Sequence, residues 1–389
     1  MSDSEQLFAD VEKLTPAITA RAAEIEMARR VPADIVESLA SIGVFRMFVP
    51  KSRGGLELDV PTAVKVIEAL AAVDGSIGWT AMINGGAALV APLLPRETFE
   101  QIYRNGPDAV IAGSAVLAGT AVRDQTGWRV TGRWPFASGC QQADWLLGAC
   151  VMTDEEKPVV KGDGAAPVVR GFFLPARDWA IEDTWYATGL KGTGSTHIAL
   201  NATLVPEQNF FDLRTGQPCV PGPLYRALPY FVPLMHGAVH LGIARSALDD
   251  IVTLAQTGWR QERADSPLRD SELFRNQLGR ALGDLRAAQA FYDAQVTRHW
   301  DYAVSGAPKD EDLLAQGTQT AVWIAATCID VVEACFELGG SSAVFDSSAL
   351  QRRMRDIRVA AQHGVVQRRN YTNGGAMLLR KTGRSKPRM

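Results

Sequence analysis

The hydrophobic pattern of this chain changes period twice, and that change limits the possible folds more than any other feature. From residue 1 to 108, apolar residues recur every three or four positions, as on one face of a helix. From 109 to 212 the period is close to two, and turn residues interrupt the pattern at short intervals. Helical spacing returns from 213 to 389. These bounds predict an N-terminal helical domain, a central β domain and a C-terminal helical bundle.

Composition and charge argue against several classes of protein. A net charge of -3 gives no reason to expect nucleic acid or an anionic membrane as a partner. The N-terminus lacks the basic and apolar regions of a signal peptide, and no stretch approaches the roughly 18 apolar residues of a membrane helix. The five cysteines form no C-x-x-C pair, which favours free thiols in a reducing compartment. We therefore expect a cytoplasmic protein.

One stretch of the β region, WRVTGRWPFASGC, combines a strand pattern with a corner of small residues. Ser138 stands in that corner, between Phe136 and Trp145. Aromatic faces stack on flat rings, and a hydroxyl bonds the polar edge of such a ring. The stretch is therefore a candidate seat for a flat aromatic ligand. A strand end with core aromatics is the alternative interpretation.

A series of segments along nearly the whole chain carries more information in its order than any one segment does. They read RRVPADIVESLASIGVFRMFVPKSRGG, LAAVDGSIGW, GTAVRDQTGWRVTGRWPFASGC, GLKGTGSTHIALNATLVPEQNFF and FELGGSSAVFDSSALQRRMRDIRVAAQH. In this order and spacing they resemble the acyl-CoA dehydrogenase superfamily. The resemblance implies an α+β fold, with an N-terminal helical domain, a central antiparallel β-barrel-like domain and a C-terminal four-helix bundle. It also implies a homotetramer.

The same resemblance argues against a dehydrogenase. Those enzymes need a carboxylate that removes the proton alpha to the thioester. At one matching place this chain has His363 and Gly364, and at the other it has the apolar run from Phe231 to Leu234. Glu262 is the remaining carboxylate that could act as the base, so a dehydrogenase or flavin oxidase stays open as an alternative.

A histidine at that place, together with FASGC and GTGS, resembles the two-component flavin-dependent monooxygenases of the superfamily. The resemblance implies an oxygenase component that takes reduced FMN, with FAD as second choice, from a separate flavin reductase. Oxygen transfer through a C4a-hydroperoxyflavin then hydroxylates a small cyclic substrate, aromatic or heteroaromatic. An N-hydroxylase of an amino substrate and a non-catalytic flavin-binding scaffold are further alternatives.

Ser138 and His363 are the residues to which the resemblance assigns chemistry. Ser138 matches the position whose hydroxyl meets flavin N5, where it holds the N5 hydrogen and slows the loss of peroxide. His363 is expected on a helix, and as a neutral imidazole it either accepts a proton from the substrate or hydrogen-bonds the distal oxygen. A serine bonded to backbone and a histidine capped by a carboxylate are the alternative interpretations.

The other flavin contacts implied by the resemblance come from hydroxyls, glycines, arginines and one aromatic ring. Phe136, expected on the same strand face as Ser138, would pack against the ring system, and Thr120 would meet a phosphate. Either Arg260 or Arg263 would also hold the phosphate. Ordinary turn residues and solvated arginines are the alternatives. The full set assigned to the cofactor is Ser114, Thr120, Phe136, Ser138, Thr193, Ser195, Arg260, Arg263, Gly339 and Gly340.

His236 and His240 share a helix face at spacing i, i+4, which is also the spacing of zinc ligands. No glutamate follows the first histidine and no third ligand is evident, so we expect no metal. By the resemblance, one of the two histidines lines the substrate cavity, and Trp145 and Trp185 are candidates for its walls. Core packing explains either tryptophan equally well.

Overall fold

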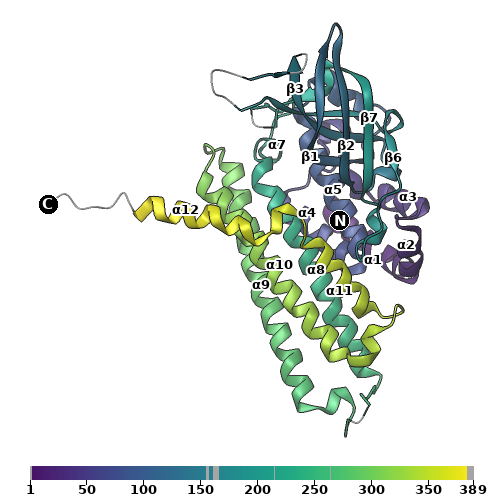
Figure 1. Cartoon of the computed structure of the whole chain (residues 1–389). Helices are drawn as coiled ribbons and strands as arrows, with labels where there is room; N and C mark the ends of the chain where they lie inside the picture. Colours follow the sequence, from purple (N-terminus) through teal and green to yellow (C-terminus); the bar gives the residue numbers. More distant parts are fainter. Residues whose placement is uncertain (1, 155–156, 161–165, 214, 263, 383–389) are drawn as a thin grey trace, which may run out of the picture.

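The computed structural model describes residues 2–154, 157–160, 166–213, 215–262 and 264–382. Helices form the N-terminal part, a single sheet follows, and long helices form the C-terminal part (Figure 1). The fold class expected from the sequence is confirmed in this order of elements. Within the described ranges, no helix has the length and apolar character needed to cross a membrane.

The N-terminal helices end where the sequence supplies caps and stops. Asp59 caps α4 by accepting the N–H of Thr62, and Gly43 ends α3 in the left-handed conformation, with a φ of 96°. The chain turns at Arg21, which separates the first two helices. The helices are α1 (Asp3–Ala20), α2 (Ala22–Ala28), α3 (Ala33–Ile42), α4 (Val60–Val73), α5 (Gly75–Val90) and α6 (Arg96–Ile102).

The sheet has the strand order β6-β7-β2-β1-β3-β5-β8, with β4 attached to β3. Its strands are β1 (Ile111–Asp124), β2 (Gly127–Ala137), β3 (Trp145–Asp154), β4 (Lys157–Pro158), β5 (Val169–Pro175), β6 (Ala180–Glu182), β7 (Thr196–Pro206) and β8 (Phe210–Phe211). The expectation of a wholly antiparallel sheet is wrong for one pair, because β1 and β3 run parallel, with Ile111 beside Trp145. After the β1–β2 hairpin, the chain crosses to the other side of β1. Alternating hydrophobicity cannot reveal such a crossing, since it is the same in both strand directions.

The long C-terminal helices extend away from the sheet, side by side (Figure 1). They are α8 (Leu228–Gln256), α9 (Glu272–Ser305), α10 (Glu311–Gly339) and α11 (Ala349–Ala360), preceded by the short α7 (Pro223–Arg226) and followed by α12 (Tyr371–Thr382). Helical periodicity continues over residues 350–369, but α11 ends at Ala360, so the expectation of a helix at His363 is wrong. His363 therefore does not lie on a helix; it begins a 3₁₀ turn at Gly364–Val366.

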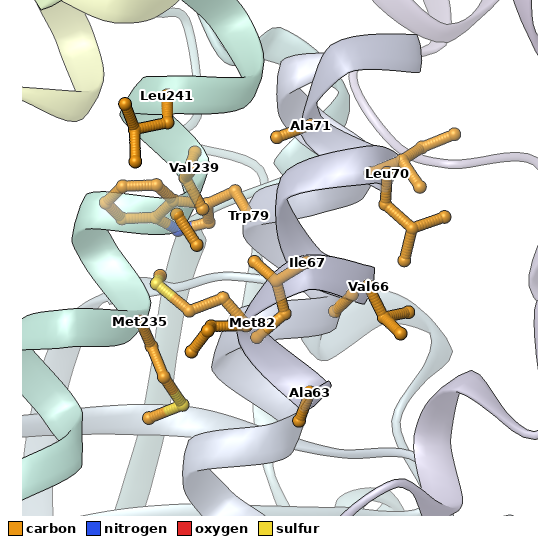
Figure 2. Close-up of a cluster of buried hydrophobic side chains, with 14 of the residues drawn as sticks. Ala63, Val66, Ile67, Leu70, Ala71, Trp79, Met82, Met235, Val239 and Leu241 are labelled. Carbon is orange, nitrogen blue, oxygen red and sulfur yellow. The ribbon is translucent and has the colours of Figure 1, made fainter. Parts of the chain in front are cut away.

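One buried core joins the N-terminal helices to the bundle. In Figure 2, α4 and α8 face each other, and α5 brings the side chains of Trp79 and Met82 between them. Gly242 of α8 allows this close packing, because a Cβ there would lie 2.3 Å from the carbonyl oxygen of Glu68 on α4. The indole of Trp79 reaches across to α8 and is 6% exposed. The core therefore fixes the position of a side chain that also enters the candidate site.

Candidate active site

A chain of hydroxyl groups lies where β2 ends. Ser138, which is 4% exposed, follows β2, and Gly139 turns the chain there with a φ of 76°. The Oγ atoms of Ser138 and Ser195 are 2.7 Å apart, and the Oγ of Ser195 is 2.6 Å from the Oγ1 of Thr193. Thr193 and Ser195 come from the loop before β7. The structure thus brings together three hydroxyls that the sequence analysis assigned to the cofactor.

Trp79 joins this hydroxyl chain to two histidines. Its indole N–H donates to the Oγ of Ser138 at 3.1 Å. The indole also meets His236 and His363 edge-on, with ring centroids 5.3 and 5.7 Å away. The two imidazoles stack on each other, 4.2 Å apart and 26° from parallel. We call Trp79, Ser138, His236 and His363 the central cluster.

Both histidines of the central cluster are neutral near pH 7. Burial, followed by the nearby His363 and His240, holds the pKa of His236 well below its ordinary value. Burial also lowers the pKa of His363. The Nδ1 of His363 accepts the backbone N–H of Val365 at 3.3 Å, so the neutral ring carries its proton on Nε2. His363 consequently presents a hydrogen-bond donor rather than a proton acceptor.

His240 lies one turn further along α8 and is fully buried. Its Nδ1 is 2.8 Å from the carbonyl oxygen of His236, so Nδ1 carries the proton. Its Nε2 is a buried lone pair without a partner among the described residues. Burial lowers the pKa of His240 to about 4.

We expect His240→Leu to make stability less sensitive to acid. The unfolded chain protonates this histidine below pH 6.5, whereas the folded chain resists protonation until about pH 4. Wild-type stability is therefore lost as the pH falls through this window, by roughly 3 kcal/mol from this group. Urea unfolding at several pH values measures the difference. Equal losses in wild type and variant would contradict the assignment.

The Arg355-Asp356 pair of α11 holds the loop that carries the hydroxyls. The Asp356 carboxylate accepts the backbone N–H of Leu190 at 2.6 Å, and the guanidinium of Arg355 donates to the carbonyl of Thr188 at 2.7 Å. Burial, followed by the nearby Asp74 carboxylate, raises the pKa of Asp356. Two contacts from one helix thus set the position of the loop against the central cluster.

Phe136 differs from its expected placement beside Ser138. It has a φ of 63°, in the left-handed region, and the β2–β7 register shifts between Trp134 and Ala137. The side chain is 61% exposed whereas Ser138 is buried, so the expectation that they share a strand face is wrong. The irregularity breaks the period of two on which that expectation depended. The Phe136 ring instead meets Trp185 edge-on, with centroids 6.4 Å apart.

Three other candidates lie in ordinary structural surroundings. Ser114 is buried in β1 and accepts the N–H of Val116 at 3.3 Å, a local turn contact. Thr120 is exposed on the same strand. Trp145 begins β3 and packs against the helical core. The turn interpretation accounts for the surroundings of Ser114 and the packing interpretation for those of Trp145, whereas Thr120 lies on the strand itself and its contact with a phosphate stays a prediction.

The remaining candidates lie at the far end of α8 from the central cluster. Arg260 and Glu262 are exposed in the turn after Gln256, and Arg263 lies outside the described residues. The amide of Gln261 donates to the carbonyl of Leu338 at 3.3 Å, which places this turn at the end of α10. Gly339 and Gly340 are there as well. At about 1.5 Å per residue, α8 separates His236 from this turn by roughly 30 Å. One copy of the chain does not bring the two sets together.

Sequence reasoning did not single out Trp79 or Asn84 as functional residues. Both lie on α5, a mostly apolar and buried helix. The amide of Asn84 donates to the carbonyl of Ile111 at 3.3 Å, and its Oδ1 is buried without a partner among the described residues. A buried indole N–H or amide needs a hydrogen-bond partner. Polar groups on an apolar helix are therefore the sequence feature that could have identified Trp79 and Asn84.

The residues present fit a flat ligand with polar edges, such as a flavin. Phe136 and Trp185 offer aromatic faces, and Ser138 offers a buried hydroxyl. Buried polar atoms without partners, Oδ1 of Asn84 and Nδ1 of His236, add further groups that a polar ligand would satisfy. Among the described residues, no group of three or more His, Cys, Asp or Glu residues is arranged to hold a metal ion.

Comparison with known families matches both helical parts. Residues 3–101 match the family described as acyl-CoA dehydrogenase, N-terminal domain, and residues 234–368 match acyl-CoA dehydrogenase, C-terminal domain. These two matches together span more than half of the chain.

Individual relatives align over nearly the full length. Indole-3-acetate monooxygenase of Pseudomonas putida is 31% identical, over 93% of this chain and 90% of that protein. The oxygenase component of FADH2-dependent resorcinol hydroxylase from a Rhizobium species is 29% identical, over 88% and 86%. The solved structure of XiaF from a Streptomyces species, in complex with FADH2 and glycerol, has a TM-score of 0.88 and 27% identity, and covers 97% of this chain and 95% of that one.

Proposed function

We propose that this chain hydroxylates a small aromatic or heteroaromatic substrate. It belongs to the acyl-CoA dehydrogenase superfamily and is a flavin-dependent monooxygenase of that superfamily. The central cluster is the observation that carries the proposal. Ser138, Trp79 and two neutral histidines adjoin one another there, and the rings of the cluster contact one another and a hydroxyl rather than a carboxylate. Such a cluster offers polar contacts to a flavin edge and to oxygen, without the carboxylate that serves as base in dehydrogenation.

The chain's own residues have separate parts in this proposal. Reduced flavin, when bound, supplies the electrons that let one atom of dioxygen enter the substrate. Ser138 holds the polar edge of the ring system. The Nε2–H of His363 would donate a hydrogen bond to an oxygen atom of the substrate or of dioxygen. The rings of Trp79 and His236 exclude water from this contact, which strengthens it.

A dehydrogenase is a weaker candidate. Phe231 and Leu234 are fully buried apolar residues at one of the places where the superfamily supplies its base. Glu262, the remaining carboxylate considered, is exposed beyond the C-terminal end of α8. Within one copy, it therefore lies at the opposite end of that helix from Ser138 and does not serve the same site.

The separation of the two candidate sets supports a proposal about assembly. Arg260, Gly339 and Gly340 lie roughly 30 Å along α8 from the central cluster, so they would complete a flavin site only on a neighbouring copy. We therefore propose a homo-oligomer, specifically a homotetramer, that receives reduced flavin from a separate reductase. The cysteines of the chain are all free, which supports the further proposal of a cytoplasmic location.

A substrate screen under ¹⁸O₂ tests the proposed function. Purified protein is supplied with chemically reduced FAD or FMN and then with oxygen and a panel of phenols and indoles. We expect at least one hydroxylated product, with a single ¹⁸O atom by mass spectrometry. Bleaching of oxidised flavin by an acyl-CoA would instead support the dehydrogenase. Flavin binding with peroxide as the sole product, for every substrate, would support a scaffold without hydroxylase activity.

A further inference from the structure

The hydroxyl chain at Ser138 has one direction, which follows from counting its protons. Each hydroxyl has a single proton to donate, and an indole N–H only donates. The Oγ1 of Thr193 is 2.7 Å from the carbonyl oxygen of Leu190, which only accepts, so Thr193 donates there. Ser195 must then donate to Thr193, and Ser138 must donate to Ser195. Trp79 donates to Ser138.

This direction leaves the Ser138 hydroxyl able to accept a further hydrogen bond but with no proton to donate. Its proton is directed to Ser195, one lone pair receives the Trp79 N–H, and the other lone pair is free. All these side chains are buried, so water does not compete with the chain. A ligand atom that meets the Ser138 oxygen must therefore supply a hydrogen.

The row of hydroxyl groups ends at the carbonyl of Leu190, and further hydrogen bonds hold Leu190 in place. Its carbonyl also accepts the indole N–H of Trp185 at 3.1 Å, and its backbone N–H donates to the Asp356 carboxylate at 2.6 Å. A reversed chain would require Thr193 to give up its bond to this carbonyl. The inferred direction is thus favoured by one hydrogen bond.

We propose that Thr193, Ser195 and Trp79 are positioning residues that make Ser138 a hydrogen-bond acceptor and so give the site a preference for reduced over oxidised flavin. Reduced flavin carries an N–H at N5, whereas the N5 of oxidised flavin is itself an acceptor. Two acceptors that face each other gain no hydrogen bond. This inference rests on the proposed function, since it takes the ligand of Ser138 to be the flavin edge.

Binding of the two redox forms tests the proposal without any substrate. Dissociation constants for oxidised FAD and, under anaerobic conditions, reduced FAD are measured for the full chain. The wild type is expected to bind reduced FAD more tightly. In Thr193→Val, Ser195 loses the acceptor for its proton and can donate to Ser138 instead. The proton of Ser138 is then free to be donated to the flavin. The preference should fall about five- to tenfold, the effect of one hydrogen bond. For a two-electron couple, tenfold corresponds to a shift of about 30 mV in the potential of bound flavin.

Two further variants separate the proposed role from a packing role. Thr193→Ser keeps the hydroxyl and should keep the wild-type preference. Ser195→Ala frees the proton of Ser138 directly and should lower the preference even if Thr193→Val folds poorly. A packing role would weaken both redox forms equally and leave their ratio unchanged, which would overturn the proposal. A wild type that binds both forms equally would also overturn it, while hydroxylation by that protein would leave the proposed function standing.

Discussion

Replacing His363 with alanine is expected to lower the rate of hydroxylated-product formation by about 10²- to 10³-fold, the range typical for loss of one positioned hydrogen-bond donor. The imidazole is stacked on His236 and meets the edge of Trp79, so its Nε2–H is held in one direction. Product is quantified by chromatography under single-turnover conditions. Peroxide release should account for the reduced flavin that no longer yields product.

His363→Gln separates the two roles considered for this histidine. A glutamine amide keeps an N–H donor but cannot take up a proton. If His363 donates, as its tautomer in the structure indicates, the glutamine variant should retain more activity than the alanine variant. Equal loss in both variants would instead favour a proton acceptor. Thermal unfolding of each variant checks that the fold is retained.

The pH profile gives a second readout for the same histidine. Burial lowers the pKa of His363 from its ordinary value of 6.5, so the ring stays neutral below that pH. The decline in product formation as the pH falls should therefore have its midpoint below 6.5. A decline already centred near 6.5 would contradict the burial of this group in the working enzyme.

Ser138→Ala is expected to divert most reduced flavin from product to peroxide. The change removes a buried hydrogen bond worth about 1–3 kcal/mol, which corresponds to a loss of about 5- to 150-fold in the product-to-peroxide ratio. The Trp79 indole N–H and the Ser195 hydroxyl both lose their partner as well. The ratio is measured by product chromatography and a peroxide assay on the same sample.

Thr80→Val is the matched control for Ser138→Ala. Thr80 is also buried, its methyl lies near Gly139, and its hydroxyl donates to the carbonyl of Ser76 in its own helix at 2.8 Å. The valine keeps the shape and removes the hydroxyl, so the ratio of product to peroxide should stay close to that of the wild type. An equal fall in the two variants would show that the effect comes from local packing.

The sequence was sufficient to predict the elements because their signals are local. The change of period located the sheet, and the structure has caps such as Asp59 and stops such as Gly43 at the helix ends. Resemblance placed Ser138, Thr193 and Ser195 around one ligand, and the structure brings their hydroxyls together, although the outer two are far apart in the chain. Their individual roles with flavin stay predictions.

What could not be predicted depends on contacts between distant segments. The bond from Trp79 to Ser138 joins two domains, so neither local pattern contains it. Apolar spacing continues past Ala360, yet the chain leaves the helix there and His363 begins a tight turn. The left-handed backbone of Phe136 is unusual for a residue with a large side chain, and its propensity favours an ordinary strand.

Trp79 is part of both the core shown in Figure 2 and the central cluster, and this limits how the substrate range of the protein can change. Truncation of a core tryptophan removes about 3–5 kcal/mol, a large part of the 5–15 kcal/mol that holds a typical domain folded. Evolution or engineering toward bulkier substrates thus has little freedom to replace Trp79. Phe136 is exposed and Trp185 is half-buried, so changes at these two aromatic side chains should disturb the core less, and we expect new substrate ranges to arise there first.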